Sequence, residues 1–255
     1  MIELERLQNL FKSLSPYDIR TIIQFATTES ENDPIDEAAL ERILSRFKAE
    51  KYSEIPIEEI IENFLRVHEI YKGTPCLGIF TPNIVQRDLL RHIESYDKVL
   101  YPKYRVDGVT TFLCAYIAIK SYLKETHTIF VSPNVASSEQ AFEKTCEFID
   151  QLNTELLLSK GYGAAFKIRN HKMLRLYNNS TIRFVNDNQI DSVRGIGDID
   201  YAIIDEAQFI KKYSTLRNVI EATLAKGGRI VETYTLVNRK RDEDFDRSKK
   251  FPIFV

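Results

Sequence analysis

The chain has 255 residues, of which 44% are hydrophobic, and only 9 glycines and 8 prolines, a composition typical of a globular protein and not of a disordered one. Its formal net charge of −2 provides no overall positive charge for binding nucleic acid, although a local basic patch can be offset elsewhere. The 3 cysteines are scattered without metal-ligand spacing, which favours a reducing compartment over a disulfide framework.

Residues 1–74 are predicted to form a small helical subdomain, because apolar residues recur there three and four positions apart. The expected helices cover residues 4–14, residues 35–47 and a segment that follows Ile55-Pro56 and runs through Val67. Glycine and proline within 72–75, together with Gly78, predict a linker to the next domain. No pattern in the subdomain indicates chemistry, so we interpret it as an appendage or a partner-docking module.

Residues 75–255 are predicted to form an α/β domain, a mainly parallel sheet flanked by helices, because strand and helix patterns alternate along them. The expected strands are 98–105, 128–132, 173–177, 181–185, 200–205 and 229–235. The expected helices are 84–93, 110–124, 136–152 and 214–225. The longest apolar run, Phe112 to Ile119, is too short to span a bilayer.

Turn residues refine this pattern. Asn178-Asn179-Ser180 separates two strand patterns and predicts a hairpin. Gly227-Gly228 predicts the end of the helix before it. Residues 239–250 are densely charged and predict a loop, and 251–255 are expected to be a last strand.

The segment Tyr201 to Ala207 is an apolar run that ends in two adjacent carboxylates, Asp205 and Glu206. A buried parallel strand delivers such a pair to the carboxyl edge of its sheet. In a nucleotide hydrolase the first carboxylate holds Mg²⁺ and the second polarises the attacking water. The alternative is a strand followed by a solvated turn, where acidic residues are common.

A second candidate segment, Lys103 to Thr111, lies between a predicted strand and a predicted helix. In the phosphate-binding pattern G-x-x-x-x-G-K-[ST], backbone N–H groups at a helix N-terminus face the phosphates and a lysine adds positive charge. Gly108 and Thr110 fit this pattern, but Val109 stands at the lysine position and Lys103 at the first glycine. Lys103 or Arg105 could supply the charge; otherwise the segment is an ordinary strand-to-helix turn.

Five segments follow one another in an order that resembles a known family. They are Val85 to Leu90, Arg105 to Thr111, Asp191 to Gly197, Ile203 to Ile210 and Thr233 to Thr235. In this order they are similar to the adenine-recognition segment, the R-x-x-G-K-T-T phosphate loop, an Arg-Gly stretch, the Walker B strand and the threonine-rich coupling motif of the large terminase subunit. That subunit is the DNA-packaging motor of tailed bacteriophages, and its ATPase domain is a P-loop NTPase of the ASCE type.

The resemblance implies roles for individual residues. The implied ATP-binding residues are Gln86 at the adenine, with Lys103, Arg105, Gly108, Val109, Thr110 and Thr111 around the phosphates. Thr110 and Asp205 would hold Mg²⁺, and Glu206 would activate water. Lys103 and Arg105 would stabilise charge during catalysis. Thr233 or Thr235 would sense the γ-phosphate and couple hydrolysis to movement, and Arg194 is a candidate nucleotide sensor.

The function implied by the resemblance is Mg-ATP hydrolysis that drives double-stranded DNA into a procapsid in the host cytoplasm. The implied partners are a portal protein, a small terminase subunit and further copies of the chain in a ring, with no membrane. Val109 favours an alternative, a nucleotide-binding or DNA- or partner-docking module whose phosphate loop is degraded. A helicase-like ATPase is a third possibility, but it normally needs a second motor domain, for which the chain has no room.

Complete large terminases also carry a C-terminal nuclease with carboxylates clustered on strands. Asp242, Glu243, Asp244 and Asp246 crowd instead into a charged segment that is expected to be a loop. We therefore expect no nuclease on this chain.

Overall fold

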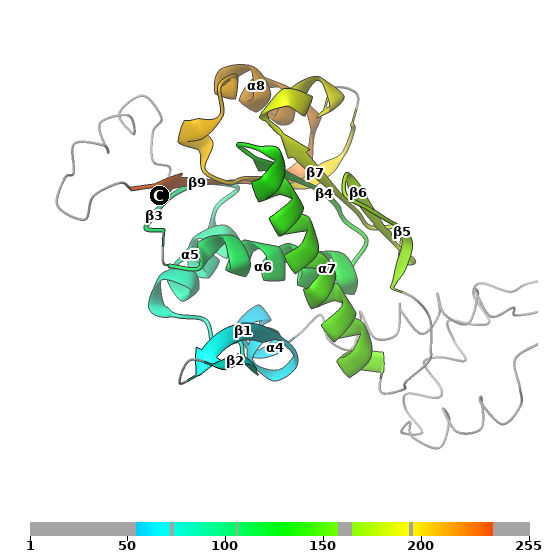
Figure 1. Cartoon of the computed structure of the whole chain (residues 1–255). Coiled ribbons are helices and arrows are strands. Elements are labelled where there is room, and N and C mark those ends of the chain that lie inside the picture. The colour runs from blue at the N-terminus through cyan, green and yellow to red at the C-terminus, as the bar shows by residue number, and fades with distance from the viewer. Residues whose placement is uncertain (1–54, 72–73, 106, 158–164, 194–195, 237–255) are drawn as a thin grey trace, which may run out of the picture.

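A computed structural model describes residues 55–71, 74–105, 107–157, 165–193 and 196–236 (Figure 1). Several predicted features lie outside these described residues: the helices at 4–14 and 35–47, Arg194, the charged loop at 239–250 and the last strand at 251–255.

A seven-stranded sheet forms the centre of the described chain. In spatial order its strands are β3 (Lys98–Lys103), β9 (Leu224–Thr235), β8 (Ile199–Ile204), β4 (His127–Ser132), β7 (Thr181–Asn186), β6 (Met173–Leu176) and β5 (Phe166–Asn170). Neighbours from β3 to β7 are parallel, and the β7–β6 and β6–β5 pairs are antiparallel. The predicted α/β fold with a mainly parallel sheet is confirmed, and so is the hairpin at 178–180.

Helices cover both faces of the sheet (Figure 1). They are α4 (Ile57–Phe64), α5 (Ile84–Ser95), α6 (Val109–Leu123), α7 (Val135–Leu157) and α8 (Tyr213–Thr223), with the 3-10 segments η1 (Asp187–Val193) and η2 (Ala207–Phe209). Helices α4, α5, α6 and α7 share one apolar core, and α8 packs in a second. Successive strand residues point to opposite faces, so Ile203 joins the first core and Ile204 the second.

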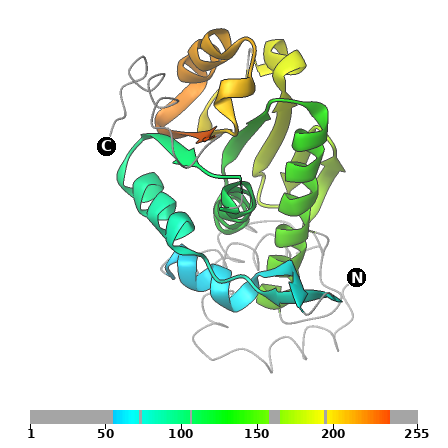
Figure 2. The same ribbon diagram turned by 60° about the vertical axis from the view of Figure 1, so that its left-hand side comes forward.

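Helix α6 is the most deeply buried helix of the first core, and Figure 2 shows it nearly end on, enclosed by other elements. The whole run from Phe112 to Ile119 is buried. A helix that is apolar on all sides is stable only when it is surrounded by protein. This burial holds the N-terminus of α6, at Gly108, next to the carboxyl end of β3.

The predicted linker around residue 74 is wrong. Thr74–Ile79 form strand β2, which pairs with β1 (Arg66–Tyr71) as an antiparallel hairpin. The preceding helix therefore ends at Phe64 and does not run through Val67, which lies in β1. Backbone pairing between the two strands outweighs the turn-forming residues of this segment. The division into residues 1–74 and 75–255 stays a prediction, and its boundary falls inside β2.

The expected glycine stop of the last helix is also wrong. Helix α8 ends at Thr223, and β9 begins at the next residue, so Gly227 and Gly228 lie inside a strand. Gly227 has a φ of 82°, and a Cβ on Gly228 would lie 2.5 Å from the carbonyl oxygen of Ile199. The two glycines therefore allow a backbone irregularity between β9 and β8, at the point where the pairing register shifts.

Within the part of the chain that the structure describes, no helix combines the length and apolar character needed to cross a membrane.

Candidate functional site

The strand register brings the two predicted segments to the same edge of the sheet. Ile204 is level with Glu232, so Asp205, the residue after β8, is level with Thr233 of β9. Lys103, the last residue of β3, is level with Thr235. Residues that are about a hundred positions apart in sequence therefore meet at the carboxyl edge, where parallel sheets with helices on both faces place their ligand sites.

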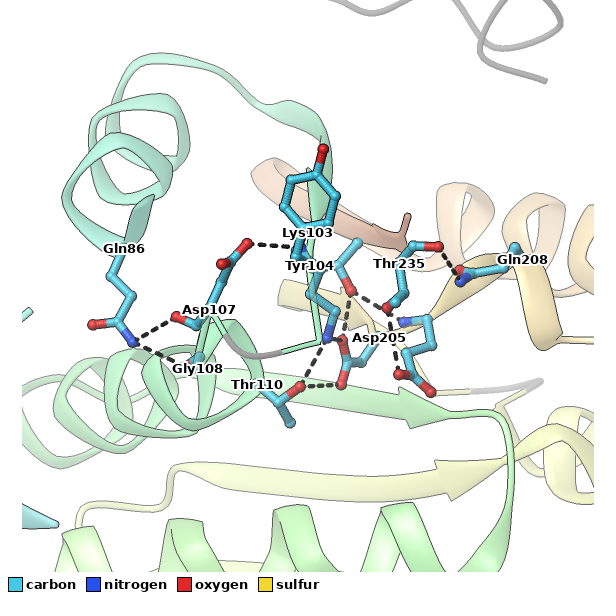
Figure 3. Close-up of polar contacts among 11 residues, drawn as sticks. Gln86, Lys103, Tyr104, Asp107, Gly108, Thr110, Asp205, Gln208 and Thr235 are labelled. Atoms are coloured by element: carbon cyan, nitrogen blue, oxygen red, sulfur yellow. Dashed lines mark hydrogen bonds and ion pairs between the residues drawn. The ribbon is translucent and has the colours of Figure 1, made fainter. Parts of the chain in front are cut away.

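Lys103 is buried, with a relative exposure of 5%. Figure 3 shows its side chain pointing toward Thr110 and Asp205. Its Nζ lies 2.5 Å from Asp205 Oδ1 and donates a hydrogen bond of 2.9 Å to Thr110 Oγ1. Lysine is almost never fully buried without a charged partner. The ion pair with Asp205 explains how this charged side chain can be buried.

The Asp205 carboxylate accepts two further hydrogen bonds. Thr110 Oγ1 donates to Oδ2 at 2.7 Å, and Thr233 Oγ1 donates to Oδ1 at 2.5 Å. Three elements, α6, β3 and β9, thus contribute a side chain to one carboxylate. Charge-assisted hydrogen bonds of this kind are about twice as strong as neutral ones.

Glu206 follows in a backbone conformation that non-glycine residues rarely adopt, with a φ of 53° and a ψ of 48°. Its N–H donates to Thr233 Oγ1 at 3.1 Å, and its Oε1 accepts from Thr235 Oγ1 at 3.4 Å. Thr233 therefore touches the side chain of one carboxylate and the backbone of the other. Sparsely populated backbone conformations persist where surrounding contacts hold them, and they cluster at functional sites.

The turn before α6 is held by Gln86 of α5. The Gln86 amide nitrogen donates to the carbonyl oxygens of Asp107 and Gly108 at 3.2 and 3.1 Å, and its amide oxygen accepts from the Asn83 N–H. Gly108 has a φ of 66°, and a Cβ on it would lie 2.8 Å from that amide nitrogen. Both ends of the Gln86 amide are thus used within the protein, and its predicted contact with adenine stays a prediction.

The other predicted residues lie apart from this hydrogen-bonded group. Val109, at the lysine position of the standard pattern, is 1% exposed and packs in the first core. Thr111 is half-buried on α6, and Arg105 is exposed. Of the two cations proposed to replace the missing lysine, Lys103 is the one that contacts Thr110 and Asp205.

Two residues of the site were missed from the sequence. Asn83 caps α5, exchanging hydrogen bonds with Gln86, and its Nδ2 donates to the Asp107 carbonyl oxygen at 3.0 Å. The pattern N-x-x-Q before an apolar run is a capping signature that could have revealed it. Gln208 Nε2 donates to the Thr235 carbonyl oxygen at 3.1 Å, a contact with no local sequence signal.

The side-chain oxygen atoms of Thr110 and Asp205 are suitable ligands for a magnesium ion. Thr110 supplies a hydroxyl and Asp205 a carboxylate, and both already contact one cation, the Lys103 ammonium. Among the described residues there is no cluster of three or more His, Cys, Asp or Glu that could hold a metal by itself. Mg²⁺ is usually bound by one or two carboxylates together with water and substrate phosphates, so the set suits a metal that arrives with a nucleotide.

No protein-family model matches the sequence, and no curated protein matches it either. Among solved structures, the chain is similar to the large terminase ATPase domain of Thermus phage P74-26. An arginine-to-alanine mutant of that domain matches with a TM-score of 0.51 and 19% identity, over 65% of this chain and 70% of that one. The same domain without the mutation matches with a TM-score of 0.50 and 18% identity, over 61% and 65%. The described chain therefore has a terminase-like ATPase fold.

Proposed function

We propose that this chain hydrolyses Mg-ATP as the ATPase of a viral DNA-packaging motor. The observation that carries the proposal is the direct contact of Lys103, Thr110 and Asp205 at the N-terminus of α6. A cation, a hydroxyl and a carboxylate at a helix N-terminus are the groups that binding of a metal-bound triphosphate requires. The terminase-like fold supports the same function.

The phosphates would bind over the turn at Gly108. The backbone N–H groups and the dipole at the start of α6 favour negative charge there. In the proposal Lys103 supplies the cation of the missing lysine, and Thr110 and Asp205 hold the metal. Bound Mg²⁺ would neutralise charge on the phosphates. Arg105 is exposed two residues beyond Lys103 and remains our candidate for stabilising charge during phosphoryl transfer.

Glu206 is the proposed base that orients and polarises the attacking water. It is half-buried, and its backbone is held by Thr233. Thr233 also contacts Asp205. A movement of Asp205 at the metal would therefore be transmitted through the Thr233 hydroxyl to the Glu206 backbone and to β9. This arrangement supports Thr233 as the coupling residue, with Thr235 beside it.

The wider motor role is proposed from the fold. The partners would be double-stranded DNA, a portal protein, a small terminase subunit and other copies of the chain in a ring. Arg194 stays a candidate sensor of nucleotide, and Gln86 a candidate contact to adenine.

Glu206→Gln tests the proposal against the alternative of a docking module. We expect this variant to bind Mg-ATP like the wild type and to turn it over about 10²- to 10⁴-fold more slowly, because only the base is lost. Turnover and equilibrium ATP binding should be measured together, since a motor subunit can be slow without DNA. Lys103→Ala should weaken both. Wild-type protein that binds Mg-ATP but hydrolyses it no faster than Glu206→Gln would favour the docking module.

A further inference from the structure

A row of polar residues crosses four adjacent strands at the carboxyl edge of the sheet. The register places Thr233 of β9, Asp205 after β8, Ser132 of β4 and Asn186 of β7 at one level. The residue two positions before each of them packs in the first core, on the α6 and α7 side: Val231, Ile203, Phe130 and Phe184. Because side chains alternate along a strand, all four polar side chains point to that same face.

Ser132 differs from the other three in its hydrogen bonding. Thr233 and Asp205 bond to each other, and Asn186 Nδ2 donates to Gln189 Oε1 at 3.2 Å. Ser132 is 1% exposed, and its Oγ has no hydrogen-bond partner among the described residues. A buried hydroxyl without a partner costs free energy, so such a group needs an explanation in a folded protein.

The position of Ser132 supplies that explanation. Neighbouring strands lie about 4.8 Å apart, so Ser132 flanks Asp205 on the side opposite Thr233. Mg²⁺ keeps several water ligands when it binds with a nucleotide. Resting on the function proposed above, we propose that the Ser132 hydroxyl hydrogen-bonds a water ligand of the Mg²⁺ held by Thr110 and Asp205. Ser132 is then a positioning residue for the metal, acting from the strand beyond the acidic one.

The same strand provides a matched control. Thr128 lies four residues before Ser132 on the same face of β4, is 3% exposed, and also has a hydroxyl without a partner among the described residues. It sits near the other end of the strand, about 13 Å away at the usual rise per residue. Thr128→Val and Ser132→Ala each remove one unpartnered hydroxyl with little change in shape, so neither should lower the thermal unfolding midpoint of the free protein.

The test is equilibrium binding of the non-hydrolysable analogue AMP-PNP, measured by calorimetry with saturating Mg²⁺ and again in EDTA. We expect Ser132→Ala to raise the Kd in Mg²⁺ about three- to tenfold, the worth of one hydrogen bond, with little change in EDTA. Thr128→Val should change neither value. Equal Kd values for Ser132→Ala and Thr128→Val in Mg²⁺ would overturn the inference, and so would equal losses with and without the metal. Wild-type protein without Mg²⁺-dependent binding would refute the proposed function itself.

Discussion

At the scale of single residues, Lys103 serves the free protein as well as the proposed nucleotide complex. Its ammonium lies between Thr110 and Asp205, at the point where the two proposed metal ligands meet. Binding of Mg-ATP would therefore exchange one cation for another at the Asp205 carboxylate. A buried ion pair contributes little net stability, but removing one member leaves the other charge buried and uncompensated.

Lys103→Ala should lower the free energy of unfolding by about 3–5 kcal/mol in the absence of ligand. The Asp205 carboxylate would lose its cation and keep, among the described residues, two threonine donors. Urea denaturation measures this change. Arg105→Ala is the control, since Arg105 is exposed two residues along and its loss should change stability by no more than about 0.5 kcal/mol. Two variants of equal stability would show that the ion pair does not hold the apo site together.

At the scale of elements, α8 is attached to β9 through a buried carboxylate. Tyr213 OH and Arg217 Nη1 donate to Glu232 Oε2 at 2.5 and 3.1 Å, while Glu232 Oε1 lacks a partner among the described residues. Burial raises the pKa of Glu232 above its ordinary value, against the opposing effects of Arg217 and Tyr213. Glu221, one turn further along α8 than Arg217, has a lowered pKa, chiefly because Lys98 donates a hydrogen bond to it.

These two shifts predict opposite pH dependences. A raised pKa in the folded state means that the Glu232 contribution to stability falls as pH rises from the unfolded pKa through the folded one. Glu232→Gln should therefore gain stability relative to wild type as pH rises from about 4.3.

The lowered pKa of Glu221 stabilises the fold above the unfolded pKa, and this benefit is lost on acidification. Glu221→Gln should lose stability relative to wild type over the same rise in pH. Urea unfolding of the three proteins between pH 4 and pH 8 measures both slopes, and slopes of one sign would contradict the assignment.

At the scale of the whole molecule, the site joins segments that are far apart in the chain. Lys103 and Thr110 belong to β3 and α6, whereas Asp205 and Thr233 follow or lie in β8 and β9. Strand β9 lies between β3 and β8, so the cation and the carboxylate approach each other across an intervening strand. A ligand that contacts both Lys103 and Asp205 would therefore link β3 and α6 to β8 and β9.

Mg-ATP should therefore stabilise the whole fold in one cooperative transition. At a ligand concentration 100 times the Kd, the expected gain is about 2.7 kcal/mol. The shift in unfolding midpoint should shrink in EDTA and in Asp205→Asn. Asp200→Asn is the control, because Asp200 lies at the other end of β8 from Asp205 and accepts a hydrogen bond from the His127 N–H of β4. The stability of the free Asp200→Asn variant will change, but its shift on adding Mg-ATP should equal that of wild type. An Asp205→Asn shift as large as that of Asp200→Asn would argue against a metal site at Asp205.

Much of the fold follows from local patterns. The apolar run from Phe112 to Ile119 predicts a buried helix, and the run that ends at Ile204 predicts a buried strand, because burial requires apolar side chains at those positions. The errors arose where local turn signals competed with pairing. Residues 72–75 and Gly227-Gly228 look like breaks in isolation, yet β1 pairs with β2 and β8 with β9 across them.

The sequence by itself determined the order of the strands and helices from α5 to β9, apart from β5, and placed Gly108, Asp205 and Glu206 at the ends of elements. Only the tertiary structure brought Lys103 into contact with Thr110 and Asp205, placed Val109 in the core, and set Ser132 beside Asp205. The reason is physical: periodicity records which face of an element is apolar, whereas contacts between elements depend on strand order and register. A shift of one residue in register would turn Lys103 or Ser132 to the opposite face of the sheet.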